Sequence, residues 1–464
     1  MNETQFDIAV IGGGPGGYVA AIRAAQLGMR PVVIEREHLG GICLNWGCIP
    51  TKALLRAAEL RHSIDEMKDF GITVGEVSID LAMVVKRSRK VAGRLSMGVK
   101  HLLKKNKIRV IEATAKIGPK NGDLRQIDLD NGTAITAKHV IIATGARARD
   151  LPGIKADGQK ILTYREAMVP ETMPDSLIIV GSGAIGAEFA SFYHDMGVKV
   201  TVLEAMDRML PVEDVEISEF VQKSFEKRGI TVMTGVKLAS VKTDAGGVIA
   251  TGEGLSEPLR ASRMILAVGI IGNTENIGLE ATSIKLDRGH IVTNEWGATA
   301  TDGLFAIGDV TGPPWLAHKA SHEGIICVEK IASMKNLHPI GKGAVPGCTY
   351  CRPQVASVGL TEAAAKAAGH DLKVGRFPFA ANGKAIALGD DGGFVKTVFD
   401  AKTGELLGAH MVGPEVTELI QGYAIARTLE ATEAELMSTI FPHPTLSEAM
   451  HESVLDAYDR AIHF

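Results

Sequence analysis

The stretch that determines the fold class is Phe6-Asp7-Ile8-Ala9-Val10-Ile11, followed by Gly12-Gly13-Gly14-Pro15-Gly16-Gly17. The apolar residues predict a short strand, and the glycine cluster predicts a turn. A helix-like run, Tyr18 to Leu27, and a second apolar strand, Pro31 to Ile34, complete a unit of about 30 residues. Strand, turn, helix and strand in this order form the βαβ building block of a parallel sheet.

Three spaced glycines in this turn suit the phosphates of a dinucleotide. Gly12 permits a tight turn, Gly14 lets the backbone approach a pyrophosphate, and Gly17 permits close packing of helix on strand. The N-terminus of the following helix stabilises the anion. Glu35, which ends the second strand, can accept hydrogen bonds from ribose hydroxyls. We therefore predict a dinucleotide site here.

The same organisation returns later in the chain as an internal repeat. A second unit begins at Leu177 and ends at Glu204, and its turn has the same glycine spacing, with Gly181, Gly183 and Gly186. A carboxylate at Glu204 would repel a 2′-phosphate, so NAD is favoured over NADP. One glycine motif has little weight, but two in matching contexts favour binding sites over simple turns. The sequence thus predicts an α/β fold with two Rossmann-like dinucleotide-binding domains.

A close cysteine pair follows the first unit, in Gly40-Gly41-Ile42-Cys43-Leu44-Asn45-Trp46-Gly47-Cys48-Ile49-Pro50-Thr51-Lys52. The spacing of Cys43 and Cys48 puts both side chains on one face of a helical turn, which suits the Cα separation of under about 7 Å in disulfides. Pro50 and Lys52 suit a helix start, and a helix N-terminus lowers a thiol pKa. Two core cysteines or half of a metal site are the alternatives.

The two dinucleotide sites favour redox chemistry for this pair. Electrons must pass between a dithiol and a nicotinamide, and a flavin can carry them. FAD and NAD are therefore the expected cofactors, and no metal is expected.

Composition argues against several other functions. The chain has 464 residues, 45% of them hydrophobic and 22% charged, and its net charge is −4, as in a globular enzyme of several domains. The charge is spread along the chain, and glycines and an acid interrupt the longest apolar run, so neither nucleic acid nor membrane binding is expected. No targeting signal is recognisable at the N-terminus, so a cytoplasmic location is expected. The basic segment 83–108 predicts a long helix with a solvated face, or else a surface for an acidic partner.

The pattern changes from Gly347 onward and predicts a separate α+β domain. Strands are expected at 355–358 and 393–399, and helices at 361–368, 416–429 and 447–462. Within this region His443 lies between two prolines, which restrict its backbone. Thiol exchange needs a proton acceptor, and Glu448 could orient the ring of His443 and raise its basicity. An ordinary loop histidine is the alternative.

Together these motifs resemble the pyridine nucleotide–disulfide oxidoreductases, and the cysteine segment is similar to that of the dihydrolipoamide dehydrogenases. The resemblance covers essentially the whole chain and includes Ala143-Thr144-Gly145, the region 301–309 and Phe441-Pro442-His443-Pro444-Thr445-Leu446-Ser447-Glu448. It implies that Cys48 is the thiol nearest the flavin and that Cys43 exchanges with the substrate. It also implies that His443, with Glu448, serves the thiols of the other subunit.

The resemblance further implies cofactor contacts, domains and partners. Beyond the glycine motifs, Glu35 and Glu204, the expected cofactor-binding residues are Lys52, Ala115, Thr144, Gly145, Glu188, Gly269, Asp309 and Ala317. The expected domains are 1–148 for FAD, 149–271 for NAD, 272–345 completing the FAD site, and 346–464 for dimerisation. The expected partners are a second copy of the chain, lipoyl-bearing domains and the acyltransferase core of a 2-oxo acid dehydrogenase complex, with glycine cleavage as the other complex. Ser321 and His322 depart from the family, where acids are expected.

Several related activities remain as alternatives. A glutathione reductase-like protein would favour NADP through basic residues, whereas Glu204 stands here. A mercuric reductase-like protein would carry a C-terminal cysteine pair, whereas this chain ends Ala461-Ile462-His463-Phe464. A flavin-bearing assembly protein with structural thiols is the alternative from another class.

Some residues stand outside the predicted site. Cys348 and Cys351 form a second close pair with no adjoining flavin motif and are expected to be incidental thiols, and Cys327 is expected in the core. His451 and His463 are expected at the surface. An acidic stretch in the C-terminal domain is either a solvated helix end or a docking surface for the acyltransferase, and it consists of Glu430, Glu433 and Glu435.

Overall fold

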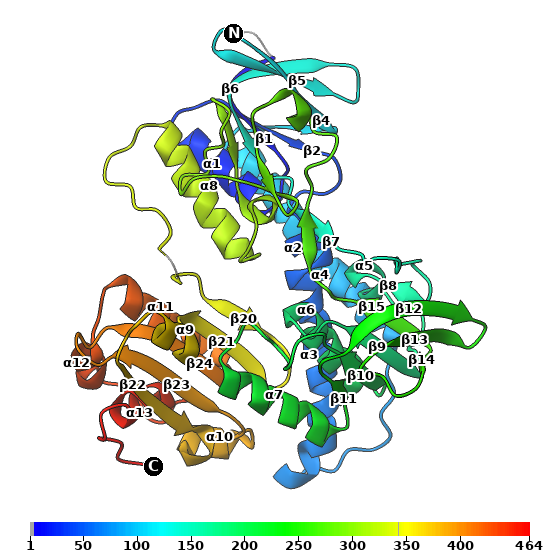
Figure 1. Cartoon of the computed structure of the whole chain (residues 1–464), viewed down its shortest axis with the longest axis vertical. Coiled ribbons are helices and arrows are strands. Elements are labelled where there is room, and N and C mark those ends of the chain that lie inside the picture. Colours follow the sequence, from blue (N-terminus) through cyan, green and yellow to red (C-terminus); the bar gives the residue numbers. More distant parts are fainter. Residues whose placement is uncertain (1–3, 342) are drawn as a thin grey trace. The chain divides into compact units, whose positions relative to one another are not determined.

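The computed structural model describes residues 4–341 and 343–464 of the chain (Figure 1). The chain folds into two compact units, each with its own sheets. Unit 1 comprises Met1–Leu54, Ala82–Arg149 and Gly269–Ile340. Unit 2 comprises Leu55–Leu81, Asp150–Val268 and Gly341–Phe464. Each unit therefore combines segments that are far apart in the sequence.

Unit 1 is built on a seven-stranded sheet with the order β3-β2-β1-β6-β5-β4, in which β19 also pairs with β6. The strands are β1 (Gln5–Ile11), β2 (Pro31–Glu35), β3 (Arg109–Glu112), β4 (Ala115–Asn121), β5 (Leu124–Leu129), β6 (Ala134–Ile142) and β19 (Leu304–Ala306). The pairs β1–β2, β1–β6, β2–β3 and β6–β19 are parallel, whereas β4–β5 and β5–β6 are antiparallel. The apolar residues of β1 are buried, as expected for a parallel strand covered on both faces.

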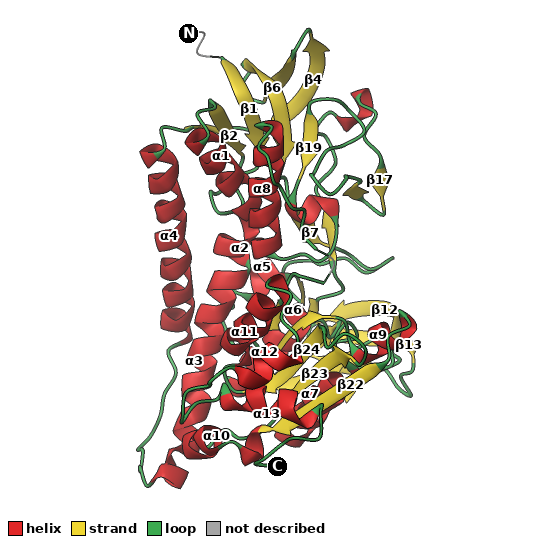
Figure 2. Cartoon of the chain, turned by 90° about the vertical axis from the view of Figure 1, so that its left-hand side faces the viewer, coloured by secondary structure: helices red, strands yellow, loops and turns green. Residues whose placement is uncertain are grey.

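Two helices lie side by side in unit 1, α1 (Pro15–Gln26) and α8 (Ala317–Ile331), as Figures 1 and 2 show. Glycine permits their close approach, because a Cβ added at Gly16 would lie 3.0 Å from the carbonyl oxygen of Ala320. The other helices are α2 (Gly41–Trp46), the start of α3 (Cys48–Glu66), α4 (Leu81–Lys105), η2 (Leu279–Ala281) and η3 (Gly308–Thr311). Short strands form two further pairs, β7 (Ala146–Ala148) with β16 (Ile270–Gly272) and β17 (Leu286–Asp287) with β18 (His290–Ile291).

Unit 2 contains a second parallel sheet with the order β11-β10-β9-β15-β8. Its strands are β8 (Ile161–Leu162), β9 (Ser176–Val180), β10 (Lys199–Leu203), β11 (Thr231–Met233) and β15 (Arg263–Leu266). The associated helices are α5 (Tyr164–Ala167), α6 (Ala184–Asp195) and α7 (Val215–Arg228). A small antiparallel sheet accompanies them, with β12 (Lys237–Asp244), β13 (Gly247–Glu253) and β14 (Leu259–Ala261).

The C-terminal part of unit 2 is a five-stranded antiparallel sheet with the order β20-β21-β24-β23-β22. Its strands are β20 (Gly347–Thr349), β21 (Gln354–Gly359), β22 (Leu372–Pro378), β23 (Phe394–Asp400) and β24 (Leu406–Gly413). The helices are α9 (Glu362–Ala367), η4 (Phe379–Ala381), α10 (Gly383–Leu388), α11 (Val416–Thr428), α12 (Glu433–Ser438) and α13 (Glu448–Asp456), and η1 (Met67–Phe70) follows α3.

Helices cover both faces of this C-terminal sheet. Successive side chains of a strand point to opposite faces. On β23, the Thr397 hydroxyl donates to the carbonyl oxygen of Ser453 on α13, whereas its neighbour Lys396 contacts Asp214 at the start of α7. Helices α7 and α13 therefore lie on opposite faces. The core on the α13 side includes Tyr423 of α11.

The predicted α/β class, with two Rossmann-like sheets and a C-terminal α+β region, is confirmed. The basic helix is also confirmed, as α4. The helix expected at 447–462 is shorter, because α13 ends at Asp456 and the chain then turns back, with the N–H of Ile462 donating to Glu452 at 3.0 Å. Within the described residues, no helix has both the length and the apolar character needed to span a membrane.

The structure shows the burial and contacts of three residues that lie outside the predicted site. Cys327 is fully buried in the core, as expected. His463 is 70% exposed, as expected, and its Nδ1 lies 2.7 Å from a carboxylate oxygen of Glu452. The expectation for His451 is wrong, because this ring is half-buried, stacked on Phe441, and pairs through Nε2 with a backbone carbonyl.

Candidate active site

The two cysteines stand at a break between two helices in unit 1. Cys43 belongs to α2, and Cys48 is the first residue of α3. Gly47 makes the break, and a Cβ added there would lie 3.1 Å from the carbonyl oxygen of Ile42. The two cysteine side chains make a hydrogen bond, at a separation from which a disulfide can form. The distorted helical turn that the spacing predicts is therefore present.

Cations of the basic helix α4 hold this turn. Arg89 donates to the carbonyl oxygen of Asn45 at 2.5 Å, and its guanidinium lies over the ring of Trp46, 4.2 Å from the centroid. Arg87 donates to the carbonyl oxygen of Ala53 at 3.2 Å. Arg87 and Arg89 come from the segment expected to form a solvated face or a surface for an acidic partner. They fix instead the C-terminal end of α2 and the first turns of α3. Sequence reasoning missed this role, because the contacts join segments about 40 residues apart.

The pKa of Cys43 lies well above its usual range. The chief cause is the hydrogen bond with Cys48, and burial adds to it. Lys52 acts in the opposite direction and Asp309 in the same direction, so both belong to the electrostatic surroundings of the pair. The expected lowering by a helix N-terminus is outweighed at Cys43 by the neighbouring sulfur. Such a pair titrates as a unit, and a thiol that keeps its proton needs an external base for exchange.

The thiol helix begins next to the first dinucleotide loop. A Cβ added at Gly41 would lie 2.8 Å from the Cα of Gly14, so α2 starts in contact with the start of α1. Tyr18, in the first turns of α1, was not singled out from the sequence. Burial raises its pKa, and the charge of Cys43 adds to this effect, which places Tyr18 beside the thiols. Its position directly after Gly17 was the available signal.

The first loop has the geometry of a dinucleotide cradle. Gly12 has φ +109°, and a Cβ added there would lie 2.2 Å from the carbonyl oxygen of Ala143. A Cβ added at Gly17 would lie 1.9 Å from the carbonyl oxygen of Gly12. Glu35 accepts the N–H of Gly13 at 2.7 Å. Among the described residues no side chain caps the N-terminus of α1, and although Pro15 has no N–H, the N–H groups that follow it are available to an anion.

The second loop, in unit 2, repeats this geometry. Gly181 has φ +96°, with an added Cβ 2.4 Å from the carbonyl oxygen of Ala267, and a Cβ at Gly186 would lie 1.9 Å from the carbonyl oxygen of Gly181. Glu204 is buried and accepts both the N–H and the hydroxyl of Ser182, at 2.8 and 2.7 Å. At Gly183 an added Cβ would meet nothing within 4 Å. No side chain of the described part of the chain caps α6.

Other predicted cofactor residues lie around the sheet of unit 1. Thr144 and Gly145 follow β6, and the Thr144 hydroxyl donates to the carbonyl oxygen of Asn273 at 2.8 Å. Three more stand at the edges of elements, with Ala115 first in β4, Ala317 first in α8, and Gly269 at φ +102° just before β16.

Asp309 stands in η3, beyond the end of β19. Burial raises its pKa, Lys319 opposes this effect, and Glu323 adds to it. Lys319 and Glu323 form an ion pair of 2.8 Å on α8, and Glu323 accepts the N–H of Gly308 at 2.7 Å. Acids were expected at Ser321 and His322, and the acid that contacts this turn is Glu323 instead. The i,i+4 spacing of Lys319 and Glu323 was the signal for it.

His443 and Glu448 form a pair in unit 2. Nδ1 of His443 lies 2.9 Å from one carboxylate oxygen of Glu448, and the other oxygen accepts the N–H of Thr445 at 2.9 Å. Partial burial opposes ionisation of Glu448, but the bonds from Thr445 and His443 outweigh it and lower the pKa of this carboxyl. The imidazole is 78% exposed, so it is accessible to another molecule. Glu188 is buried on α6 and accepts the N–H of Tyr350 at 2.9 Å.

The predicted site residues thus fall into two groups. Unit 1 brings together the thiols, Lys52, Asp309 and the first loop. Unit 2 contains the second loop, Glu188 and the pair of His443 with Glu448.

Two family models match the chain. One, described as pyridine nucleotide-disulphide oxidoreductase, matches residues 6–324. The other, described as the dimerisation domain of these proteins, matches residues 345–454. The chain belongs to the pyridine nucleotide-disulphide oxidoreductase family.

Relatives within this family match from end to end. The chain is 58% identical to the dihydrolipoyl dehydrogenase of Rhizobium etli over 477 residues, covering 99% of each chain. It is 55% identical to the dihydrolipoyl dehydrogenase of Zymomonas mobilis over 463 residues, again covering 99% of each. LpdA of Mycobacterium tuberculosis has a similar solved structure, with a TM-score of 0.90, 30% identity, and coverage of 97% of this chain and 99% of that one.

A solved structure of a protein named for a different activity also matches. The Cu(II) complex of the HOCl-induced flavoprotein disulfide reductase RclA from Escherichia coli has a TM-score of 0.86 and 26% identity, covering 98% of this chain and 99% of that one. Family membership makes this chain a flavoprotein disulfide oxidoreductase.

Proposed function

We propose that this chain oxidises dihydrolipoyl groups at the Cys43–Cys48 pair, with FAD as its flavin and NAD as the electron acceptor. The observation that carries this proposal is the direct contact of the two thiols beside the first dinucleotide loop. Near-complete matches to dihydrolipoyl dehydrogenases support the substrate class.

The residues of unit 1 fit FAD. The first loop offers a cradle that any Cβ at Gly12 or Gly17 would fill, and an uncapped helix end for a pyrophosphate. Glu35 would bind the adenosine ribose, Asp309 the ribityl chain, and Lys52 the ring region. When bound, FAD supplies a carrier that takes an electron pair from a dithiol and passes hydride to a nicotinamide.

Thiol exchange proceeds from the disulfide form of the pair. One substrate thiolate attacks the sulfur of Cys43, the Cys43–Cys48 bond breaks, and Cys48 leaves as a thiolate. The second substrate thiolate then attacks the substrate sulfur of this mixed disulfide and releases Cys43. The substrate loses two electrons and two protons and becomes a disulfide, while the cysteine pair gains the two electrons. Low-pKa leaving thiols leave faster, and the helix start at Cys48 suits the leaving group.

A base must accept protons from the substrate thiols, and we assign this role to His443. Glu448 holds Nδ1, which fixes the tautomer and leaves Nε2 to take a proton. The match of residues 345–454 to a dimerisation domain supports a homodimer. In that dimer the thiols would be served by His443 of the partner subunit.

The second loop fits NAD rather than NADP. Glu204 would bind the ribose diol, and a carboxylate offers about four acceptor positions. Three protein donors use the carboxylate, namely the N–H and hydroxyl of Ser182 and the N–H of Met206. One position remains for a ribose hydroxyl, and a 2′-phosphate would be repelled. Glu188 would line the nicotinamide end.

We further propose the domain limits 1–148 and 272–345 for FAD, 149–271 for NAD and 346–464 for dimerisation. The proposed partners are lipoyl-bearing domains and the acyltransferase core of a 2-oxo acid dehydrogenase complex, or the glycine cleavage complex, in the cytoplasm.

Among the acidic residues proposed for docking, Glu435 caps α12 with Thr432. Its substitution would therefore disturb the helix as well as the charge. Charge reversal at Glu430 and Glu433 is therefore the cleaner test, and unchanged assembly with the acyltransferase would exclude this surface.

A turnover assay on the purified protein tests the proposed function. Dihydrolipoamide with NAD should give rapid NADH formation, and glutathione disulfide or mercuric ion with NADPH should give little turnover. Activity confined to NADPH and glutathione disulfide would overturn the substrate assignment. Cys43→Ser should abolish exchange with lipoamide and keep the bound flavin. Loss of flavin in this variant would mean that Cys43 is structural.

A further inference from the structure

The chain beyond β10 links the second dinucleotide loop to the C-terminal sheet. Leu210, in this connection, donates its N–H to the carbonyl oxygen of Ser182 at 3.3 Å. Leu210 has φ +45° and is 1% exposed. A leucine in the left-handed region is strained, and such a conformation persists only where its surroundings fix it. The contacts that fix Leu210 therefore also fix one side of the dinucleotide loop.

Helix α7 supplies those contacts. The carbonyl oxygen of Leu210 accepts the hydroxyl of Ser218 at 3.0 Å and the N–H of Glu213 at 2.9 Å. Ser218 is fully buried, and its N–H donates to the carbonyl oxygen of Asp214 at 3.0 Å. Asp214 caps α7 by accepting the N–H of Glu216 at 3.1 Å. The connection and the first turn of α7 are thus one hydrogen-bonded piece.

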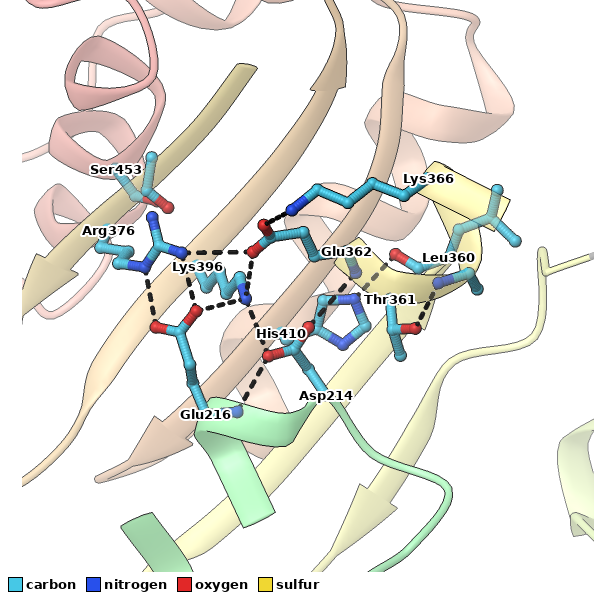
Figure 3. A network of polar contacts seen from close by, with 12 residues as sticks. Asp214, Glu216, Leu360, Thr361, Glu362, Lys366, Arg376, Lys396, His410 and Ser453 are labelled. Carbon is cyan, nitrogen blue, oxygen red and sulfur yellow. Dashed lines mark hydrogen bonds and ion pairs between the residues drawn. The ribbon is translucent and has the colours of Figure 1, made fainter. Parts of the chain in front are cut away.

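Asp214 is in turn held by the C-terminal sheet, as Figure 3 shows. Lys396 on β23 is 1% exposed and donates to Oδ1 of Asp214 at 2.8 Å. The N–H of Glu362, at the start of α9, donates to Oδ2 at 3.2 Å. Lys396 also contacts Glu216 at 2.6 Å and Glu362 at 2.8 Å, and Arg376 bridges the same two carboxylates. We call these five residues the Lys396 network.

The charges of the Lys396 network depend on one another. Two cations face three carboxylates, and Lys366 contacts Glu362 at 2.6 Å from the exposed side. Breaking a buried ion pair on one side leaves an uncompensated charge and is strongly destabilising. Loss of Lys396 would therefore remove the charged tie between Asp214 and the C-terminal sheet and leave the 3.2 Å bond from the N–H of Glu362.

Contacts farther along α7 do not involve this network. Arg228 pairs with Asp195 at 2.5 Å, and Arg352 pairs with the same carboxylate at 3.0 Å. Phe220 packs edge-on against Phe394, with centroids 5.9 Å apart. Without Lys396 the helix would stay attached to the C-terminal sheet, also through the pair of Glu216 with Arg376, and the change would be confined to Asp214 and the Leu210 connection.

We propose that Lys396 is a positioning residue for the pyridine nucleotide, acting through Asp214 and Leu210 on the second dinucleotide loop. This inference rests on the proposed function, in which that loop binds NAD. The ribose of a dinucleotide lies at the carboxyl end of the second strand of such a unit. Here that end leads directly into the connection between Glu204 and Leu210. The C-terminal sheet thereby sets the affinity of the NAD site without touching the nucleotide.

The test compares Lys396→Met holoenzyme with wild type. Methionine matches lysine as far as Cε and removes the ammonium group with its charge. The KM for NAD should rise about fivefold to tenfold, a usual range for coupling through packed networks. Reduction of the cysteine pair by dihydrolipoamide, measured without NAD, should keep its rate. Lys402→Met is the matched control, since it removes an exposed pair with Asp371, and its KM for NAD should equal that of wild type.

The outcomes separate the two proposals. A wild-type protein that neither reduces nor binds NAD would overturn the proposed function. Wild-type NAD binding together with an unchanged KM in Lys396→Met would overturn the positioning role alone. An equal rise in the KM for dihydrolipoamide would also overturn it, because a general loss of structure has no preference for NAD.

Two further variants keep the test decisive. The double variant Lys396→Met with Glu362→Gln restores the charge balance, so its melting temperature should recover while its KM for NAD stays raised. Recovery of both would attribute the effect to charge imbalance and contradict positioning through Asp214. If Lys396→Met does not fold, Asp214→Asn keeps a capping side chain and weakens the tie to Lys396. It should raise the KM for NAD by a smaller factor, and an unchanged KM would refute the proposal.

Discussion

The two dinucleotide loops share a backbone pattern that extends beyond the glycines. Gly12 and Gly181 donate their N–H groups to carbonyl oxygens near the end of the neighbouring strand, those of Ile34 and Leu203 respectively, both at 2.8 Å. The carbonyl oxygen of the next residue accepts an N–H from the connection after that strand, from Gly40 at 2.8 Å in unit 1 and from Leu210 at 3.3 Å in unit 2. Both donors have a left-handed φ, +91° and +45°.

The segments after these two donors differ. Gly40 leads into the helix that carries Cys43, whereas Leu210 leads into α7 and the Lys396 network. A glycine adopts the left-handed conformation without strain, but a leucine needs support. The two loops also differ in how tightly other elements pack on them. Gly16 is buried against α8, whereas the corresponding Ile185 is 39% exposed. The comparison shows that the glycine motif fixes the cradle, and the segment after the second strand determines what the cradle is connected to.

The largest expected effect comes from the third glycine of each loop. Gly186→Ala places a methyl group 1.9 Å from the carbonyl oxygen of Gly181, so the loop must open. Overpacking of about 3 kcal/mol corresponds to a loss of NAD reduction of about 100-fold. Flavin absorbance and reduction of the cysteine pair should remain. Gly17→Ala, with the same 1.9 Å contact, should instead lose FAD. If each variant lost both cofactors, the two loops would not act as separate sites.

A smaller and more selective effect is expected at the second glycine. At Gly183 an added Cβ meets nothing within 4 Å, and φ is −64°, which any residue adopts. Gly183→Ala should therefore keep the melting temperature. Its methyl group would stand where the backbone approaches the pyrophosphate, so the KM for NAD should rise about tenfold, for about 1.4 kcal/mol of lost binding. A lowered melting temperature with normal KM would show that this glycine serves the fold.

The parts of the fold and of the site that were predictable from sequence are those that depend on local patterns. Both βαβ units, both strand-end carboxylates and the thiol turn depend on short-range spacing, which survives in any context. The contacts of Arg89 and Lys396 were not predictable, because their partners lie far away in sequence. The sequence also does not show whether a lysine or an arginine is buried or exposed. The end of α13 was missed because Glu452 binds the returning chain, a tertiary contact that overrides helical periodicity.

The tighter packing around the first dinucleotide loop predicts that it tolerates substitution less well than the second. Gly16→Ala adds a Cβ 3.0 Å from the carbonyl oxygen of Ala320 and 3.2 Å from Ile307, and it should destabilise unit 1 by about 1–3 kcal/mol. Ile185→Ala removes a partly exposed side chain and should change stability by no more than about 0.5 kcal/mol. Urea unfolding of the two variants measures both effects. Equal destabilisation would mean that the second loop is covered as tightly as the first.

The smallest expected effect is on stability at acidic pH. It distinguishes the Lys396 network from the surroundings of Asp309. The hydrogen bonds from Arg376 lower the pKa of Glu216 to about 2 from 4.5, helped by Lys396 and opposed by burial. A lowered folded-state pKa stabilises the protein above the unfolded value, and this stabilisation declines as the pH falls from 4.5 toward about 2. Asp309 has the opposite sign, because its raised pKa makes ionisation unfavourable in the folded state.

Glu216→Gln isolates the network's share of this pH dependence. The wild type should melt at a higher temperature than the variant at neutral pH, and the difference should shrink as the pH falls below about 4.5, where the unfolded carboxyl takes up its proton. Salt should reduce the difference, since the Arg376–Glu216 pair is 41% and 37% exposed and exposed pairs are screened. Melting curves between neutral pH and pH 3 measure the convergence. A difference that stayed constant over this range would mean that Glu216 stabilises unit 2 by packing rather than by its charge. The same result would weaken the case for the Lys396 network as an electrostatic support of the second loop.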